Sequence, residues 1–186
     1  SIDGINIKDY KLSNLRKNIG IVLQDVFLFS DTIFNNITLK DESISLNEVK
    51  LAAKQIGVHE FIMSLPNNYY YNVKERGIML SSGQRQLIAF LRVYVSNPQI
   101  LILDEATSSI DSTSEVLIQN ATEKLTENRT SLIIAHRLAT IKKANNIIVM
   151  GSGNIIEQGS HKELISNMNG YYKKLYDAQF QVKNVS

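Results

Sequence analysis

The sequence contains no cysteine among its 186 residues. A disulfide framework and any cysteine-based zinc site are therefore excluded, and the absence is compatible with a reducing compartment. Proline is almost absent too: Pro66 and Pro98 are the only two, and we expect a helix to end before each of them. There is no repeat or low-complexity segment. With 44% hydrophobic and 20% charged residues, the composition is that of a globular domain.

Long apolar runs are missing as well. No stretch approaches the roughly 20 apolar residues that cross a bilayer, and the segment from Ser1 to Asn6 does not resemble a signal peptide. The sequence opens in a strand-like pattern without methionine, which is not typical of a natural start. Its net charge of +2 is too small to indicate a nucleic-acid partner.

The hydrophobic pattern predicts an α/β fold with a mostly parallel sheet. The expected strands are short apolar or alternating runs: Ile2 to Ile7, Ile19 to Leu23, Ile100 to Leu103, Leu132 to Ala135, Ile147 to Met150 and Asn154 to Glu157. The runs at 19–23, 100–103 and 132–135 are expected to be buried strands, and the run at 100–103 is expected to be buried on both faces. The last two runs flank Gly151-Ser152-Gly153 and should form a hairpin.

Helix starts are marked by serine residues followed by glutamate three positions later, the pattern of a capping box. These pairs are Ser45 and Glu48, Ser112 and Glu115, and Ser160 and Glu163. Ser81 and Ser82 cap a further expected helix, whose apolar face is Leu87, Phe90, Leu91, Tyr94 and Val95. A short helix is expected at 59–64 and a polar amphipathic one from Tyr171. The mainly helical stretch at 44–97 has the character of an inserted subdomain.

Polar residues follow several expected strands where those strands end. Asp104 and Glu105 end one apolar run, Gln24 follows another, and His136 follows a third. Each alone is also consistent with an ordinary strand cap, loop or solvated strand end. In open α/β sheets, however, ligands bind beyond the carboxyl ends of the strands, and polar groups arriving there from separate strands favour a common site.

These residue types suit phosphoryl transfer to water. Asp104 fits a metal ion held through water, and Glu105 fits a group that orients or deprotonates the attacking water. Gln24 can touch metal or water in one conformational state, and His136 can donate to a terminal phosphate oxygen. Ser81 and Gly83 lie at an expected helix start, where free backbone N–H groups attract anions.

With these motifs in this order, the sequence resembles the nucleotide-binding domain of an ABC transporter over essentially its whole length. Gln24 resembles the Q-loop, and the run from Leu80 to Gln84 resembles the signature motif. The run from Leu101 to Glu105 resembles Walker B, that from Ser108 to Asp111 the D-loop, and that from Ala135 to Arg137 the switch histidine. The segment at 26–30, the Glu75-Arg76-Gly77 turn and the tail at 170–172 resemble the exporter branch.

The resemblance implies a P-loop NTPase-like fold and an ATPase that uses ATP and Mg²⁺. Glu105, His136 and Gln24 would be catalytic, and Asp104 with Gln24 would hold Mg²⁺, largely through water. The residues that serve the ATP of a partner chain would be Ser81, Ser82, Gly83 and Gln84. Ser109 and Asp111 would form the D-loop, in which Asp111 couples the two sites.

The resemblance further implies a head-to-tail dimer of nucleotide-binding domains, either homodimeric or heterodimeric, at the cytoplasmic face of a membrane. The segment at 26–37 and the turn at 75–77 would face the coupling helices of a transmembrane domain. Residues 1–24 would end the N-terminal strands, 25–98 would form the helical signature subdomain, and 99–186 would form the α/β core with the C-terminal helices.

One motif of the family is not in the sequence. A P-loop requires G-x-x-x-x-G-K-[ST], and no two glycines here have that spacing. We therefore expect the chain to be the C-terminal part of such a domain, whose first strands and P-loop lie before Ser1. By itself it should be inactive, and its sheet should carry uncovered apolar surface. Ser82, where the family usually has glycine, is a smaller departure.

Two other readings of the sequence are a soluble ABC ATPase of a non-transport class and a non-catalytic interaction fragment. The soluble class often carries coiled-coil or zinc insertions, and the sequence has neither heptads nor cysteine. The missing P-loop is what favours a non-catalytic fragment.

Overall fold

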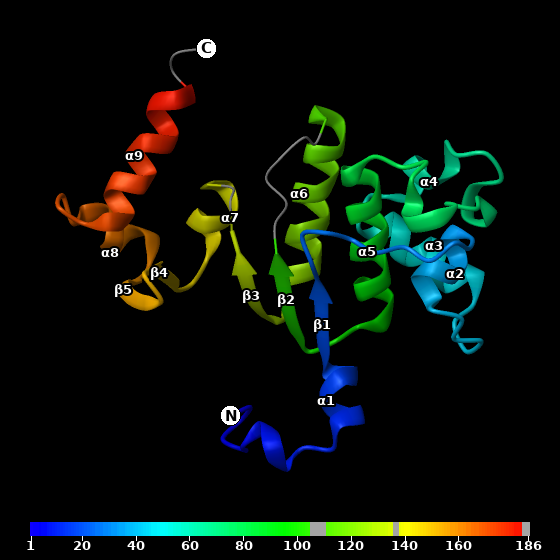
Figure 1. Ribbon diagram of the computed structural model, residues 1–186, viewed down its shortest axis with the longest axis horizontal. Helices are drawn as coiled ribbons and strands as arrows, with labels where there is room; N and C mark the ends of the chain where they lie inside the picture. The colour runs from blue at the N-terminus through cyan, green and yellow to red at the C-terminus, as the bar shows by residue number, and fades with distance from the viewer. Residues whose placement is uncertain (105–110, 136–137, 184–186) are drawn as a thin grey trace. The chain divides into compact units, whose positions relative to one another are not determined.

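The computed structural model describes residues 1–104, 111–135 and 138–183 (Figure 1). The chain divides into two compact units, 1–134 and 135–186. Each unit has its own cluster of buried hydrophobic residues.

The first unit contains a parallel three-stranded sheet, as the sequence predicts. Its strands are β1 (Ile19–Val22), β2 (Ile100–Asp104) and β3 (Thr130–Ile134), in the order β1-β2-β3. Ile21 pairs with Ile102, and Ile102 pairs with Leu132, so the strands are in register across the sheet. All carboxyl ends consequently reach the same edge.

One face of this sheet is covered by helices α5 (Ser82–Ser96) and α6 (Ser112–Thr126), which Figure 1 shows next to β1 and β2. Val22, Leu101 and Leu103 point to this side and are buried. They share one cluster with Leu87 and Leu91 of α5 and with buried residues of α6. Burial of these aliphatic side chains is the main stabilising contribution to the unit.

The other face of the sheet is open. Ile21 is 53% exposed, Leu132 58% and Ile134 53%. The prediction of uncovered apolar surface is therefore confirmed. The predictions that 19–23 and 132–135 are buried strands and that 100–103 is buried on both faces are wrong, because on this second face Ile21, Leu132 and Ile134 are exposed and Ile102 is only half-buried. The apolar composition of these strands is that of strands covered on both sides.

The helical part of the first unit follows β1. Its elements are α2 (Ile33–Thr38), α3 (Leu46–Gln55), α4 (His59–Met63) and the 3-10 turns η2 (Asn68–Tyr70) and η3 (Glu75–Gly77). Figure 1 places α2, α3 and α4 beside α5. The predicted box of Ser45 and Glu48 begins α3, and the predicted helix at 59–64 is α4. The subdomain boundaries at 25–98 stay a prediction.

The N-terminal residues differ from the prediction of a strand at 2–7. Ile2 and Ile5 form only an isolated bridge, closed by Asp3 and Gly4, which both have positive φ. The 3-10 turn η1 (Ile7–Asp9) and helix α1 (Leu12–Asn18) follow. The alternating pattern around Asp3-Gly4 marks a tight turn, and too few residues follow it to extend a strand.

The second unit comprises α7 (Leu138–Lys143), β4 (Ile147–Gly151), β5 (Asn154–Gly159), α8 (His161–Ser166) and α9 (Tyr171–Lys183). The strands form the predicted antiparallel hairpin, and Ser160 and Glu163 form the predicted capping box. Val149, Leu164 and Tyr172 are its buried centre. In the described parts of both units, every helix is too short or too polar to cross a membrane.

Candidate functional site

Two predicted site residues lie at the carboxyl edge of the sheet. Asp104 is the last residue of β2 and is half-buried, while Gln24 lies in an exposed bend just after β1. Since Val22 pairs with Leu103, the chain at Gln24 and the end of β2 leave the sheet side by side. Glu105, His136 and Ser109 lie outside the described residues, so their places relative to this edge stay a prediction.

The donor set at this edge suits magnesium. Mg²⁺ prefers oxygen ligands and keeps several waters, so a carboxylate and an amide oxygen are sufficient protein ligands. Asp104 and Gln24 supply these two oxygen types. No cluster of three or more histidine, cysteine, aspartate or glutamate side chains among the described residues would enclose a metal ion more completely.

The second group of predicted residues begins α5. Ser81 is the N-cap, and its Oγ accepts a hydrogen bond from the backbone N–H of Gln84 at 3.2 Å. The Oε1 of Gln84 accepts in return from the N–H of Ser81 at 3.0 Å, which completes a capping box. Ser82 and Gly83 occupy the first helical turn. The predicted helix start is confirmed, with Ser81 rather than Ser82 as the cap.

Asp111 begins α6. Its Oδ1 accepts a hydrogen bond from the N–H of Ser114 at 2.8 Å, so Asp111 is the N-cap. The prediction that Ser112 and Glu115 form a capping box at this helix is wrong. Aspartate is as good an N-cap as serine, and here the helix begins one residue earlier than the box would place it.

The starts of α5 and α6 border one shared hollow of about 460 Å³. Ser81, Gln84 and Asp111 line it together with the side of α4 that carries Glu60 and Phe61. The sequence predicted the first three as site residues but did not indicate that the two of α4 lie beside them. An expected helix at 59–64 was the only sign of them, and nothing in its spacing connects it with Ser81.

Exposed apolar side chains occur within or next to the two segments predicted to face a membrane domain. Phe27 is 55% exposed and Phe29 is 52% exposed, and their rings form an edge-to-face pair with centroids 5.1 Å apart. Ile78 and Met79, next to the turn at 75–77, are exposed as well. Leu28 connects the two segments, because it is fully buried against Gly77.

Comparison with known proteins gives one family. The family model described as ABC transporter matches residues 1–108. The "Putative multidrug export ATP-binding/permease protein YgaD" of Bacillus subtilis (strain 168) is 48% identical over 185 residues, which are 100% of this chain and 31% of that protein. A relative of the same description from Staphylococcus aureus (strain NCTC 8325 / PS 47) is 49% identical over 178 residues, covering 96% of this chain and 31% of the relative.

A solved structure agrees with the sequence comparisons. The structure of a bacterial Atm1-family ABC exporter with ATP bound superimposes with a TM-score of 0.84 and 40% sequence identity. The match covers 95% of this chain and 31% of that one. This chain thus spans about a third of the length of the relatives that it matches.

Proposed function

This chain belongs to the ABC transporter family, and from that premise we propose that it is part of the ATP-binding and ATP-hydrolysing domain of a membrane exporter. The observation that carries the proposal is the parallel sheet that delivers Gln24 and Asp104 to one edge. The names of the relatives, multidrug export ATP-binding/permease proteins, support the direction of transport. The domain would work at the cytoplasmic face of a membrane.

In the proposed reaction, water attacks the γ-phosphorus of ATP. The new oxygen–phosphorus bond forms as the bond to the β–γ bridging oxygen breaks, and the products are ADP and inorganic phosphate. Glu105 accepts the proton of the water, and His136 donates to the terminal phosphate. Asp104 and Gln24 would hold Mg²⁺, partly through water, and the ion would neutralise charge on the phosphate oxygens when bound.

The start of α5 would serve the ATP of a second nucleotide-binding domain. Ser81, Ser82, Gly83 and Gln84 lie on the first turn of a 15-residue helix that has no acidic residue there. Such a helix end favours a phosphate group. Ser109 and Asp111 would then couple the two sites across the dimer. The exposed rings of Phe27 and Phe29 would face the transmembrane domain.

A further part of the proposal concerns the chain by itself. The 186 residues contain no P-loop, which supplies the backbone amides and the lysine for the β- and γ-phosphates. The isolated polypeptide should therefore bind ATP weakly and not turn it over. Measurable, Mg²⁺-dependent hydrolysis by the isolated chain would contradict this statement.

The test of the proposed function uses the full-length protein in detergent or lipid. Glu105→Gln should lower kcat for ATP hydrolysis by at least about 100-fold, the usual range for loss of a general base. It should leave binding of a fluorescent ATP analogue intact. The matched control is Glu127→Gln, which alters an exposed ion pair with Lys124 and should hydrolyse ATP normally. The proposal would be wrong if the parent protein had no ATPase activity or if Glu105→Gln hydrolysed ATP as fast as the parent.

A further inference from the structure

The loop from Phe27 to Ser30 displays its two aromatic rings from a fixed base. Leu28 is 0% exposed and anchors the loop in the core, while the rings on either side of it point outward. An exposed aromatic pair on a loop would ordinarily fluctuate, since few of its own atoms are buried. Here a set of partly buried polar contacts fixes the backbone of the loop.

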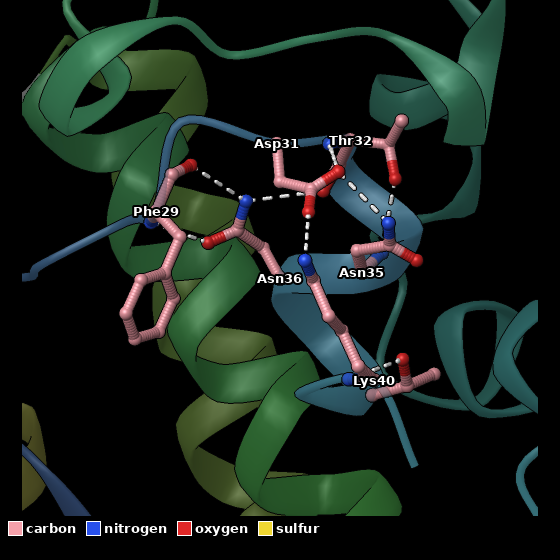
Figure 2. A network of polar contacts seen from close by, with 7 residues as sticks. Phe29, Asp31, Thr32, Asn35, Asn36 and Lys40 are labelled. Carbon is pink, nitrogen blue, oxygen red and sulfur yellow. Dashed lines mark hydrogen bonds and ion pairs between the residues drawn. The ribbon is translucent and has the colours of Figure 1, made fainter. Parts of the chain in front are cut away.

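Asn36 of α2 supplies the first of these contacts. Its side chain is fully buried, and its Oδ1 accepts from the backbone N–H of Phe29 at 2.8 Å. Its Nδ2 donates to the carbonyl oxygens of Phe29 and Thr32, both at 3.0 Å. The amide therefore pairs with both the backbone N–H and the carbonyl oxygen of Phe29, which lies outside any helix or strand. Figure 2 shows the ring of Phe29 pointing away from this network.

Arg92 supplies the second contact, from the middle of α5. Its Nε donates to the carbonyl oxygen of Asn36 at 2.8 Å, and its Nη2 lies 3.4 Å from the carbonyl oxygen of Phe27. No ion pair in the described part of the chain involves Arg92, and burial lowers the pKa of its guanidinium. A half-buried charge held by carbonyl oxygens is stabilised only while that geometry is kept.

The start of α2 is fixed in turn by Asp31. Its carboxylate accepts from the N–H of Thr32 at 2.7 Å and from Nδ2 of Asn35 at 2.8 Å. It also pairs with Lys40 at 3.0 Å (Figure 2). The loop, α2 and α5 are thus joined by hydrogen bonds over a sequence separation of up to 65 residues.

We propose that Asn36 and Arg92 form a brace that makes the Phe27–Ser30 loop part of one rigid body with α5. Because α5 begins at Ser81, a displacement of that helix start moves the two exposed rings as well. When the loop and α5 are displaced relative to β1, the backbone bends at Gln24 and Asp25, which are not part of the brace. Arg92 is a positioning residue for communication between the nucleotide and the exposed rings, and this direction of signalling rests on the proposed function.

The experiment measures whether the loop and α5 move together in the full-length protein. Spin labels are placed at the exposed positions of Ser30→Cys and Ser96→Cys, and cysteines outside this cysteine-free segment are replaced. Electron–electron double resonance then gives the distribution of label distances with and without ATP and Mg²⁺. With Arg92 present, we expect one narrow peak that ATP does not shift.

The variant Arg92→Met should lose that single peak, and ATP should then shift the distribution, because the loop no longer follows α5. Arg92→Lys keeps the charge but reaches only one carbonyl oxygen, so its distance distribution should be intermediate in width. It replaces the methionine variant in the test if that variant does not fold. The control is Lys124→Met, which removes a basic side chain that pairs with Glu127 rather than with the loop or a labelled position.

The outcomes separate the two proposals. A distribution for Arg92→Met and Arg92→Lys as narrow and as insensitive to ATP as that of the parent would overturn the brace. An ATP-dependent shift already present in the parent would overturn it too. The parent's ATP hydrolysis, measured in the same samples, judges the proposed function alone, because the width of the distance peak does not depend on turnover.

Discussion

The carboxylate of Asp111 lies 2.8 Å from the backbone N–H of Ser114, and this contact begins helix α6. Asp111→Ala should lower the free energy of unfolding by about 1 kcal/mol, the usual cost of a lost N-cap. Asp111→Asn should retain the cap and unfold like the parent in a urea titration. If the asparagine variant nevertheless loses ATPase activity in the full-length protein, Asp111 has a role beyond starting the helix.

Gly77 is a second position with a specific prediction. Its φ is +69°, and an added Cβ would lie 2.9 Å from Cδ1 of the buried Leu28. Gly77→Ala should therefore cost both the left-handed backbone strain, about 1 kcal/mol, and a further 1–3 kcal/mol or so of overpacking.

The control for Gly77 is Gly57→Ala. Gly57 has φ +78° but open space around an added Cβ, so only the backbone strain applies. Urea unfolding followed by circular dichroism should rank the Gly77 variant as clearly less stable. Equal losses for the two variants would show that Leu28 moves aside without cost.

The hydrogen bonds of Asp31 predict that its contribution to the stability of the fold depends on pH. The N–H of Thr32, followed by Lys40 and Asn35, holds the pKa of Asp31 at about 2, below its ordinary 3.8. A carboxylate with a depressed folded pKa stabilises the fold fully above its unfolded pKa, and this contribution is lost as the pH falls through the folded value. The contribution of Asp31 should thus disappear between about pH 4 and pH 2.

An NMR titration of the Asp31 carboxyl carbon tests this assignment. Lys40→Met should raise the midpoint toward the ordinary value, because it removes one of the groups that stabilise the charged form. Lys124→Met, which removes a lysine that pairs with Glu127 instead, should leave the midpoint where it is. An unchanged midpoint in the Lys40 variant would assign the whole effect to the backbone of Thr32 and to Asn35.

The open face of the sheet predicts self-association of the 186-residue chain. Ile21, Leu132 and Ile134 present contiguous apolar surface on parallel strands, and such patches drive association. Leu132→Thr combined with Ile134→Thr should shift sedimentation profiles toward monomer while keeping β-propensity. Leu51→Thr, on the exposed side of α3, should not shift them. A parent chain that is already monomeric at high concentration would contradict the prediction.

Local signals in the sequence predicted local structure well. The boxes at Ser45 and Ser160 need only residues three positions apart, and the apolar run at 19–23 needs only its own composition. The exposure of Ile21 and Leu132 was missed because composition indicates which surroundings a strand is suited to, not which elements cover it. Asn36 and Arg92 were missed because their contact joins residues 56 positions apart, and no periodic pattern connects them.

In the candidate site, too, some features follow from local sequence and others depend on tertiary packing. Gln24 and Asp104 could be placed together from strand order alone, since parallel strands share a carboxyl edge. Glu60 and Phe61 could not, because their place beside Ser81 depends on the tertiary packing of α4, which contacts α3 and η2. Whether a serine or the preceding aspartate caps α6 is likewise decided by backbone geometry at Asp111, which residue type alone does not specify.

The capping boxes of α3, α5 and α8 are equivalent in geometry but not in charge. In α3 and α8 the reciprocal partners are Glu48 and Glu163, and hydrogen bonds from Ser45 and Ser160 lower the pKa of these carboxyls, so they stay ionised. In α5 the partner is the amide of Gln84, neutral at every pH. The caps of α3 and α8 thus place a negative charge at the helix start, whereas the cap of α5 contributes none. Gln84→Glu would add a carboxylate there at neutral pH while retaining an acceptor for the N–H of Ser81.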